Sequence, residues 1–197
     1  MPCIDFSQAA NLEPDCRALN RVGGVKRDNY IGKIDDIASA FFVPGTGLTE
    51  LTLKEGKKLV RFRGTKDRNN TSNDIARGDG GKSYTHTVNF TAFISDQADL
   101  DSIEAVEDQT DLFVIAPHSD GSIRAYGLFD QDGNIGEGLS VTGGPENSGT
   151  AKTDASNLIL TFTGTMSKRP VYVVLGVDQS DTVAQFEAMT VPVPAEV

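Results

Sequence analysis

The chain has 197 residues and a net charge of −10, from 18 basic and 28 acidic side chains. This length suits one domain, and we interpret residues 1–197 as a single domain. The net negative charge argues against a general nucleic-acid-binding protein, because such proteins need a basic surface. No run approaches 18 apolar residues, so we expect no membrane partner.

Cys3 and Cys16 are the two cysteines. Two thiols cannot complete a tetrahedral zinc site, and only His86 and His118 can add to them. The first residues lack the basic start and apolar core of a signal peptide, and nothing else indicates an oxidising compartment. We therefore expect both thiols to be reduced, and we expect no metal and no other cofactor.

Along the chain, residues 1–40 form an N-terminal segment in which no strand is assigned. Further on, several short segments alternate apolar and polar residues, which is typical of strands with one buried face. We predict about nine strands, at residues 48–53, 59–63, 84–94, 111–116, 122–129, 135–143, 157–163, 169–175 and 184–191.

Between the strands at 59–63 and 84–94 lies the polar, glycine-rich segment GTKDRNNTSNDIARGDGGKS, residues 64–83. A segment of this length in a compact domain is usually functional or disordered. Because it joins two strands, we interpret it as an extended hairpin arm or a flexible loop.

The two longest alternating segments predict which side chains face the core. In 84–94, Tyr84, His86, Val88 and Phe90 share one face, and His86 is expected to be a hydrogen-bonded core histidine. In 157–163, the odd-numbered side chains face outward, and three apolar side chains face the core: Leu158, Leu160 and Phe162.

One helix is predicted at about 97–109, where Leu100, Ile103 and Val106 form an apolar stripe after a capping Ser95 or Asp96. Together the elements predict a mainly β, α+β fold. We expect an antiparallel β-sandwich or partly closed barrel with this one helix at its side.

The sequence carries few signs of a catalytic or ligand-binding motif. The Asp130-x-Asp132-x-Asn134 turn begins like a calcium loop, but Ile135 and Val141 occupy the positions that need glycine and an acid. The glycine-rich stretches lack the spacing of a phosphate-binding loop, and no G-x-S-x-G elbow supplies a nucleophile. We therefore predict that the protein is not an enzyme.

Charged residues are unevenly distributed. Residues 1–90 carry 14 basic and 11 acidic side chains, whereas residues 91–197 carry 4 and 17. A basic cluster between residues 54 and 68 fits a surface that meets an acidic partner. It comprises Lys54, Lys57, Lys58, Arg61, Arg63, Lys66 and Arg68.

Both ends of the chain carry motifs that resemble the tail tube (major tail) proteins of tailed phages of the Bacteroidetes and marine type. The N-terminal motifs are Cys3-Ile4-Asp5-Phe6, Glu13-Pro14-Asp15-Cys16 and Val22-Gly23-Gly24-Val25-Lys26, with Asp15 inserted into the family's Pro-Cys pair. The later matching positions are Gly149, Asp154, Leu160, Phe162, Gly164 and Pro170, and the helix-then-strand block at 97–116 also matches.

The resemblance implies a virion structural protein that self-assembles into stacked hexameric rings around a DNA-conducting channel. Its partners would be other copies and other tail proteins, and DNA would pass without specific binding. The resemblance implies an arm, Asn69–Gly81, that stacks rings, and acids near the lumen or ring interface. The arm candidates are Lys66, Arg68, Asn69, Asn70, Asp74 and Arg77, and the candidate acids are Asp99, Asp101, Glu104 and Glu137.

Two other interpretations remain open. A tail terminator or collar ring, or a capsid decoration protein, would share the fold and the location in the virion, after assembly in the host cytoplasm. A carbohydrate-binding β-sandwich module would need exposed aromatic platforms, and the chain has no Trp and four Tyr. The helix acids are also explained by an ordinary solvated helix face.

Overall fold

The computed structural model describes residues 24–64, 68–78, 81–92, 97–144, 146–147 and 157–190. It confirms the mainly β, antiparallel architecture predicted from the sequence. The strands are β1 (Asp28–Lys33), β2 (Ile37–Val43), β3 (Gly47–Leu53), β4 (Val60–Arg63), β5 (Asn70–Gly78), β6 (Gly81–Ala92), β7 (Leu112–Pro117), β8 (Ile123–Tyr126), β9 (Ser140–Gly143), β10 (Glu146–Asn147), β11 (Asn157–Met166) and β12 (Val171–Tyr172). The helices are α1 (Gln97–Glu107), α2 (Gln179–Ala188) and a short 3-10 helix, Ile34–Asp36.

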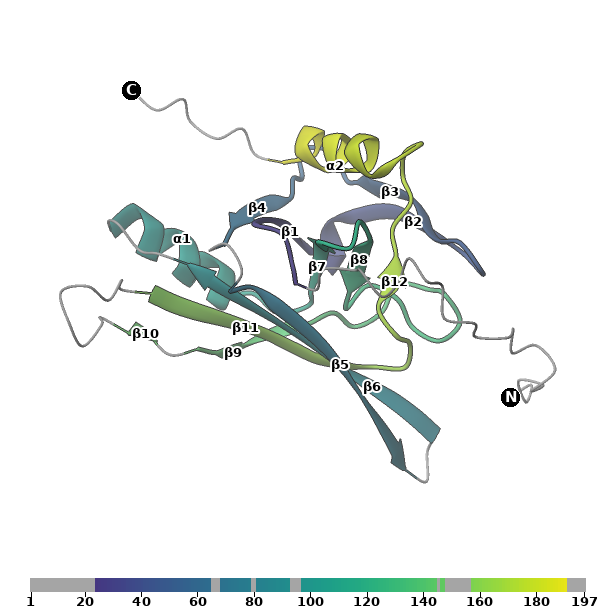
Figure 1. Cartoon of the computed structure of the whole chain (residues 1–197), viewed down its shortest axis with the longest axis horizontal. Coiled ribbons are helices and arrows are strands. Elements are labelled where there is room, and N and C mark those ends of the chain that lie inside the picture. Colours follow the sequence, from purple (N-terminus) through teal and green to yellow (C-terminus); the bar gives the residue numbers. More distant parts are fainter. Residues whose placement is uncertain are drawn as a thin grey trace.

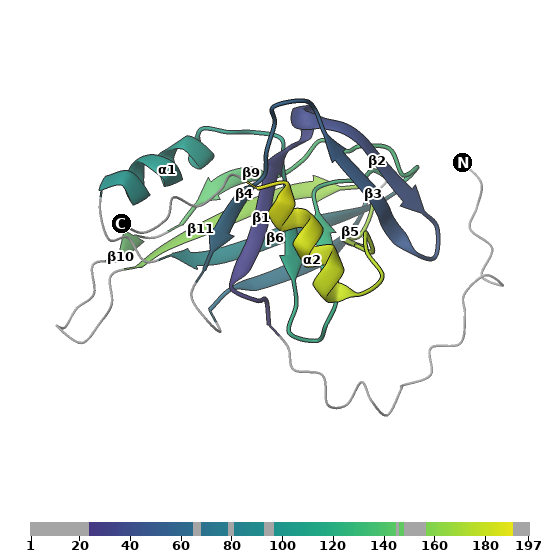
Figure 2. The ribbon, with the colours of Figure 1, turned by 90° about the horizontal axis from the view of Figure 1, so that it is seen from above.

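The elements are arranged in three layers around a central five-stranded sheet (Figures 1 and 2). The central sheet has the order β12-β8-β7-β1-β4. One of its faces is covered by a second sheet, β10-β11-β6-β5, in which β9 also pairs with β11. The other face is covered by the β2–β3 hairpin and α2. Each face of the central sheet therefore has its own hydrophobic core.

Strand β7 is buried along its whole length because it contributes to both cores. Leu112, Val114 and Ala116 point into the core beneath the second sheet, whereas Phe113 and Ile115 point into the core beneath α2 and β2–β3. Successive side chains of a strand face opposite ways, so a strand covered on both faces needs an unbroken apolar run. This explains the continuous Leu-Phe-Val-Ile-Ala sequence.

The core between the two sheets has the side-chain pattern that the sequence predicts. Strands β6 and β11 pair antiparallel over nine positions, which places Val88 opposite Phe162 and Phe90 opposite Leu160. These four side chains are buried, and the Phe90 and Phe162 rings meet edge to face with centroids 5.7 Å apart. The predicted assignment of inward faces in these two strands is confirmed.

The prediction of a last strand at 184–191 is wrong. Residues 179–188 form the second helix, α2, whose N-terminal N–H groups are capped by Asp178: its carboxylate accepts a hydrogen bond from the Asp181 N–H at 2.8 Å. Thr182 and Phe186, one turn apart, are buried, and the Phe186 ring packs 5.3 Å from that of Tyr30. The expectation of a single helix is therefore also wrong.

The remaining predicted elements differ from the structure mainly at their ends. The predicted helix at 97–109 is α1, and seven predicted strands overlap β3, β4, β6, β7, β8, β11 and β12. Of the strand predicted at 135–143, only residues 140–143 form a strand, which is β9, and the residues before it form a loop. Strands β1 and β2 lie within or beside the N-terminal segment 1–40, where the sequence indicated none.

Candidate functional site

The segment interpreted as an extended arm or flexible loop contains β5, which forms a long hairpin with β6. The two strands pair over nine positions, from Asn70 opposite Asn89 to Gly78 opposite Gly81. Residues 74–78 are exposed, as are Gly81 and Lys82, whereas His86 and Val88 further along β6 are buried. The end of the hairpin therefore projects away from the layered body (Figure 1).

Strand β5 is also the outermost strand of its sheet within the described residues. Its outer edge therefore presents backbone N–H and C=O groups without a strand partner in this part of the chain. Ile75 near its tip is 49% exposed, and a Cβ added at Gly78 or Gly81 would meet no atom within 4 Å. An exposed strand edge with an apolar side chain is a template for pairing with another chain.

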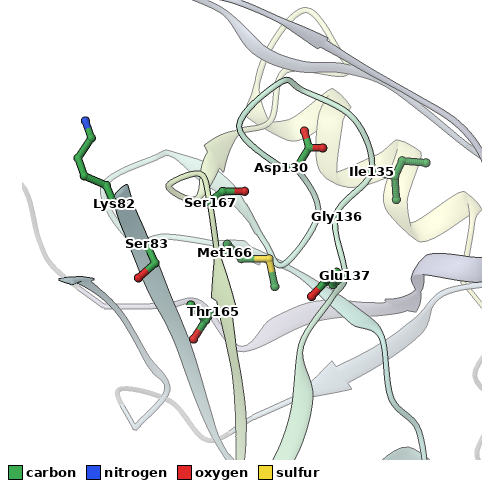
Figure 3. Close-up of a pocket in the computed structure, with 9 residues that line it drawn as sticks. All are labelled: Lys82, Ser83, Asp130, Ile135, Gly136, Glu137, Thr165, Met166 and Ser167. Carbon is green, nitrogen blue, oxygen red and sulfur yellow. The ribbon is translucent and has the colours of Figure 1, made fainter. Parts of the chain in front are cut away.

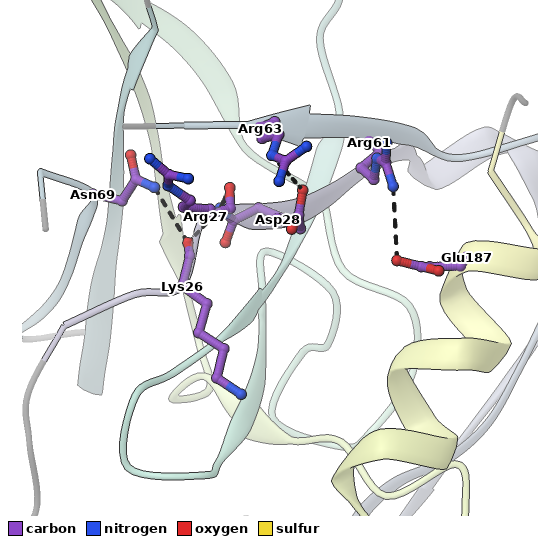
Figure 4. Close-up of polar contacts among 8 residues, drawn as sticks. Lys26, Arg27, Asp28, Arg61, Arg63, Asn69 and Glu187 are labelled. Atoms are coloured by element: carbon purple, nitrogen blue, oxygen red, sulfur yellow. Dashed lines mark hydrogen bonds and ion pairs between the residues drawn. The ribbon is translucent and has the colours of Figure 1, made fainter. Parts of the chain in front are cut away.

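The base of the hairpin is fixed by Asn69, which is buried rather than exposed. Its Nδ2 donates to the Lys26 carbonyl oxygen at 3.2 Å (Figure 4). Its Oδ1 accepts from the Thr91 N–H at 3.2 Å. These bonds join the residues just before β1 to the end of β6. Asn69 is therefore a structural anchor and offers no free contact surface, contrary to its expected place in a stacking arm.

The other expected arm residues lie at different positions between the base and the tip of the hairpin. Asn70, next to the base, accepts a hydrogen bond from Asn89 Nδ2 at 2.9 Å. Asp74 and Arg77 are exposed towards the tip, and Arg68 is exposed just before β5. Lys66 lies outside the described residues.

A basic surface lies beside the base of the hairpin, on β4 and on the residues just before β1 (Figure 4). It comprises Arg27, Arg61 and Arg63, which we call the β1–β4 basic surface, whereas the Lys26 side chain points away from them. Arg63 lies 3.6 Å from Asp28 and Arg61 lies 3.7 Å from Glu187, measured between nitrogen and oxygen. Solvent-exposed ion pairs of this kind contribute about 0–1 kcal/mol, and the surface keeps an excess of positive charge.

The candidate acids are not brought together in one place. Asp101 and Glu104 are exposed on α1, whose Ile103 packs into the core. Glu137 is exposed on a different element, the loop between β8 and β9. The side chain of Asp99 lies outside the described part of the structure. The acids therefore form a solvated helix face and a separate loop site.

Glu137 lines a pocket of about 510 Å³ between that loop, the start of β6 and the end of β11 (Figure 3). Lys82 and Met166 line the same pocket. The Asp130 carboxylate, on its rim, accepts hydrogen bonds from the Asp132 and Asn134 N–H groups at 2.9 Å. That carboxylate stabilises its own turn. None of the side chains that line the pocket forms a nucleophile–base pair.

Both histidines are buried and hydrogen-bonded. The Gly127 N–H donates to His86 Nδ1 at 3.1 Å, so the hydrogen is on Nε2, which donates to the Lys168 carbonyl oxygen at 2.9 Å. Burial lowers the pKa of His86 from 6.5 to about 4, and burial also lowers the pKa of His118. The expected role of His86 as a hydrogen-bonded core residue is confirmed.

Arg124 and Arg169 are two residues that the sequence analysis missed. Arg124 lies on β8 with its guanidinium 5.3 Å from the Tyr172 ring centroid, and Arg169 lies 5.5 Å from that of Tyr84. One feature of the sequence could have pointed to Arg124: it is a single charged residue between apolar neighbours in a short predicted strand. Nothing in the sequence connects it to Arg169, 45 positions later.

Within the described ranges, no three His, Cys, Asp or Glu side chains gather closely enough to hold a metal ion. Among the helices of the described residues, none has the length and apolarity needed to cross a bilayer. Cys3 and Cys16 fall outside the described residues.

In comparisons with known proteins, no family model, curated protein or solved structure matches this chain.

Proposed function

We propose that this chain is the tail tube subunit of a tailed phage, a non-enzymatic virion protein that self-assembles into stacked hexameric rings. The sequence motifs at both ends of the chain first suggest this function. In this proposal the subunits assemble in the host cytoplasm, meet other tail proteins at the ends of the tube, and enclose a channel through which DNA passes.

The observation that carries the proposal is the β5–β6 hairpin. Its tip projects, and β5 forms an edge that no described strand covers. A long exposed edge normally favours uncontrolled pairing, and proteins usually blunt or cover it. A ring of identical subunits provides the cover, because each copy pairs its edge with the next one.

The distribution of charge also supports association between copies. The β1–β4 basic surface and the exposed acids of α1 lie on different elements, so one copy's basic surface can meet another copy's acidic helix. Complementary charges on two patches favour head-to-tail contact and set its register. The net charge of −10 also suits a DNA channel, because phosphates are repelled by a negative wall.

The test is the morphology and mass of the purified full-length chain over a range of concentrations, by negative-stain microscopy and by size-exclusion chromatography with light scattering. We expect hollow tubes of stacked rings and a mass that increases with concentration. Single rings that never stack would indicate a terminator or collar protein instead. A strictly monomeric species at every concentration would contradict self-assembly.

A further inference from the structure

A second pocket, of about 270 Å³, lies between the edge strand β5 and the β12–β8 side of the central sheet. We call it the arginine pocket. Its lining includes two arginines and no acidic side chain. Polar and aromatic side chains line it: Thr71 and Asn73 from β5, Arg124 and Tyr126 from β8, Arg169 just before β12, and Tyr172 on β12.

Each guanidinium group makes a cation–π contact with an aromatic ring. Arg124 lies over Tyr172 and Arg169 over Tyr84, with carbon-to-centroid distances of 5.3 and 5.5 Å. Fixing a long side chain in advance lowers the entropy that a ligand would otherwise lose on binding. The arginines therefore form a preorganised pair of donor groups.

The positive charge of the pocket is only partly balanced. Arg124 Nη2 lies 3.8 Å from Asp120 Oδ2, longer than a hydrogen bond, while Asp120 Oδ1 accepts from both the N–H and the hydroxyl of Ser122. No acidic side chain of the described residues lies within ion-pair distance of Arg169. The Nε of Arg124 is buried without a hydrogen-bond partner. An anion in the pocket would supply the missing acceptors.

The neutral polar groups also present donors. Tyr126 donates its hydroxyl hydrogen to Thr71 Oγ1 at 2.9 Å, so His118 Nε2 must donate to the Tyr126 oxygen at 3.1 Å. The hydrogen of the Thr71 hydroxyl is then available to a ligand. Asn73 Oδ1 is buried without a partner, and a half-turn of the amide would present its Nδ2 hydrogens in its place.

We propose that the arginine pocket binds an oxyanion, either a carboxylate or a phosphate, between Arg124 and Arg169. Guanidinium groups match the planar or tetrahedral oxygen arrangement of these anions and form charge-assisted hydrogen bonds with them. The two sources are a small free anion, such as inorganic phosphate, or a carboxylate side chain on another protein molecule. A second copy is such a molecule, since each copy carries 28 acidic residues. The proposal does not depend on the proposed tube function.

The test is isothermal titration calorimetry of the full-length protein with potassium phosphate, acetate and glutamate at constant ionic strength, with potassium chloride as the reference. We expect saturable binding of at least one oxyanion, weakened about tenfold by Arg169→Gln, because one charge-assisted donor group is lost. Because Arg169 is exposed, we expect this variant to keep the fold. Arg124→Gln gives a second measurement. The matched control is Arg77→Gln, which removes the same charge from the exposed end of β5, outside the pocket.

The outcomes separate the two sources. Phosphate binding without carboxylate binding indicates a small free anion. Carboxylate binding as tight as phosphate binding, combined with weaker self-association of Arg169→Gln by light scattering, indicates a protein carboxylate. The proposal is overturned if no oxyanion binds the wild-type protein, or if Arg169→Gln and Arg124→Gln bind as tightly as Arg77→Gln does.

Discussion

Replacing Phe113 by alanine is expected to lower the free energy of unfolding by about 3–5 kcal/mol, the usual cost of removing a buried aromatic ring from a core. Phe113 is fully buried on β7 and lies directly opposite Gly32 of β1. A Cβ built on Gly32 would lie 2.5 Å from Phe113 Cζ and 2.7 Å from Leu59 Cδ2. The ring therefore fills the space above the glycine. Alanine at position 113 would leave a cavity in the core beneath α2 and the β2–β3 hairpin.

The measurement is urea unfolding followed by circular dichroism at pH 7. The matched control is Ile75→Ala, which also shortens an apolar side chain but at the exposed hairpin tip, where we expect a change within about 0.5 kcal/mol. Equal effects of the two variants would contradict the burial of Phe113 in the core beneath α2 and the β2–β3 hairpin.

Acidification from pH 7 to pH 4 is expected to remove about 3 kcal/mol of stability through His86 alone. Burial lowers the pKa of this imidazole from 6.5 to about 4 in the folded protein. Between these values the unfolded chain binds a proton that the folded protein does not. The contribution of His86 is therefore complete above pH 6.5 and is lost as the pH falls towards 4.

The pH dependence is measured by urea unfolding of the wild type and of His86→Asn at several pH values between 4 and 7.5. Asparagine keeps an acceptor near the Gly127 N–H but does not titrate, so the variant should be less stable at pH 7 and should lose less stability on acidification. His118 and the carboxylates are common to both proteins, and their contribution cancels in the comparison. Parallel pH profiles for the two proteins would contradict the assigned role of His86.

The regular parts of the fold were predictable because their periodicity is local. The alternation in β6 and β11 identifies Val88, Phe90 and Phe162 as core residues without any knowledge of the partner strands. The second helix was missed because Ala184–Val191 contains apolar residues that also suit a strand. The helical signals were the Asp178 cap and the spacing of Thr182 and Phe186, which begin before that segment.

The candidate site was less predictable because it depends on contacts between distant segments. The sequence places Asn69 in a polar, glycine-rich stretch, and only the packing of β1 against the hairpin base buries it. The arginine pocket is lined by residues of β5, of β8 and of the segment at β12, so Arg124 and Arg169 line one pocket only once the two sheets are packed. The hairpin itself was predictable, since a polar segment between two strands is typical of a strand connection.

The central claim is that the projecting β5–β6 hairpin joins copies of this chain. It is tested by a shortened hairpin that lacks two opposed residue pairs, Ala76 with Ser83 and Arg77 with Lys82. Removing two residues from each strand keeps every remaining side chain on its face, and the closing pair Gly78–Gly81 is retained. A full-length hairpin with Arg77→Gln and Lys82→Gln controls for the lost charges.

The measurement is the mass distribution of the three proteins by sedimentation velocity over the same concentrations, with unfolding curves to verify the fold. We predict that the wild type forms polymers, that the charge control still assembles, and that the shortened hairpin stays folded but forms no polymer. A shortened hairpin that polymerises like the wild type, or a wild type that is monomeric at every concentration, would contradict the account.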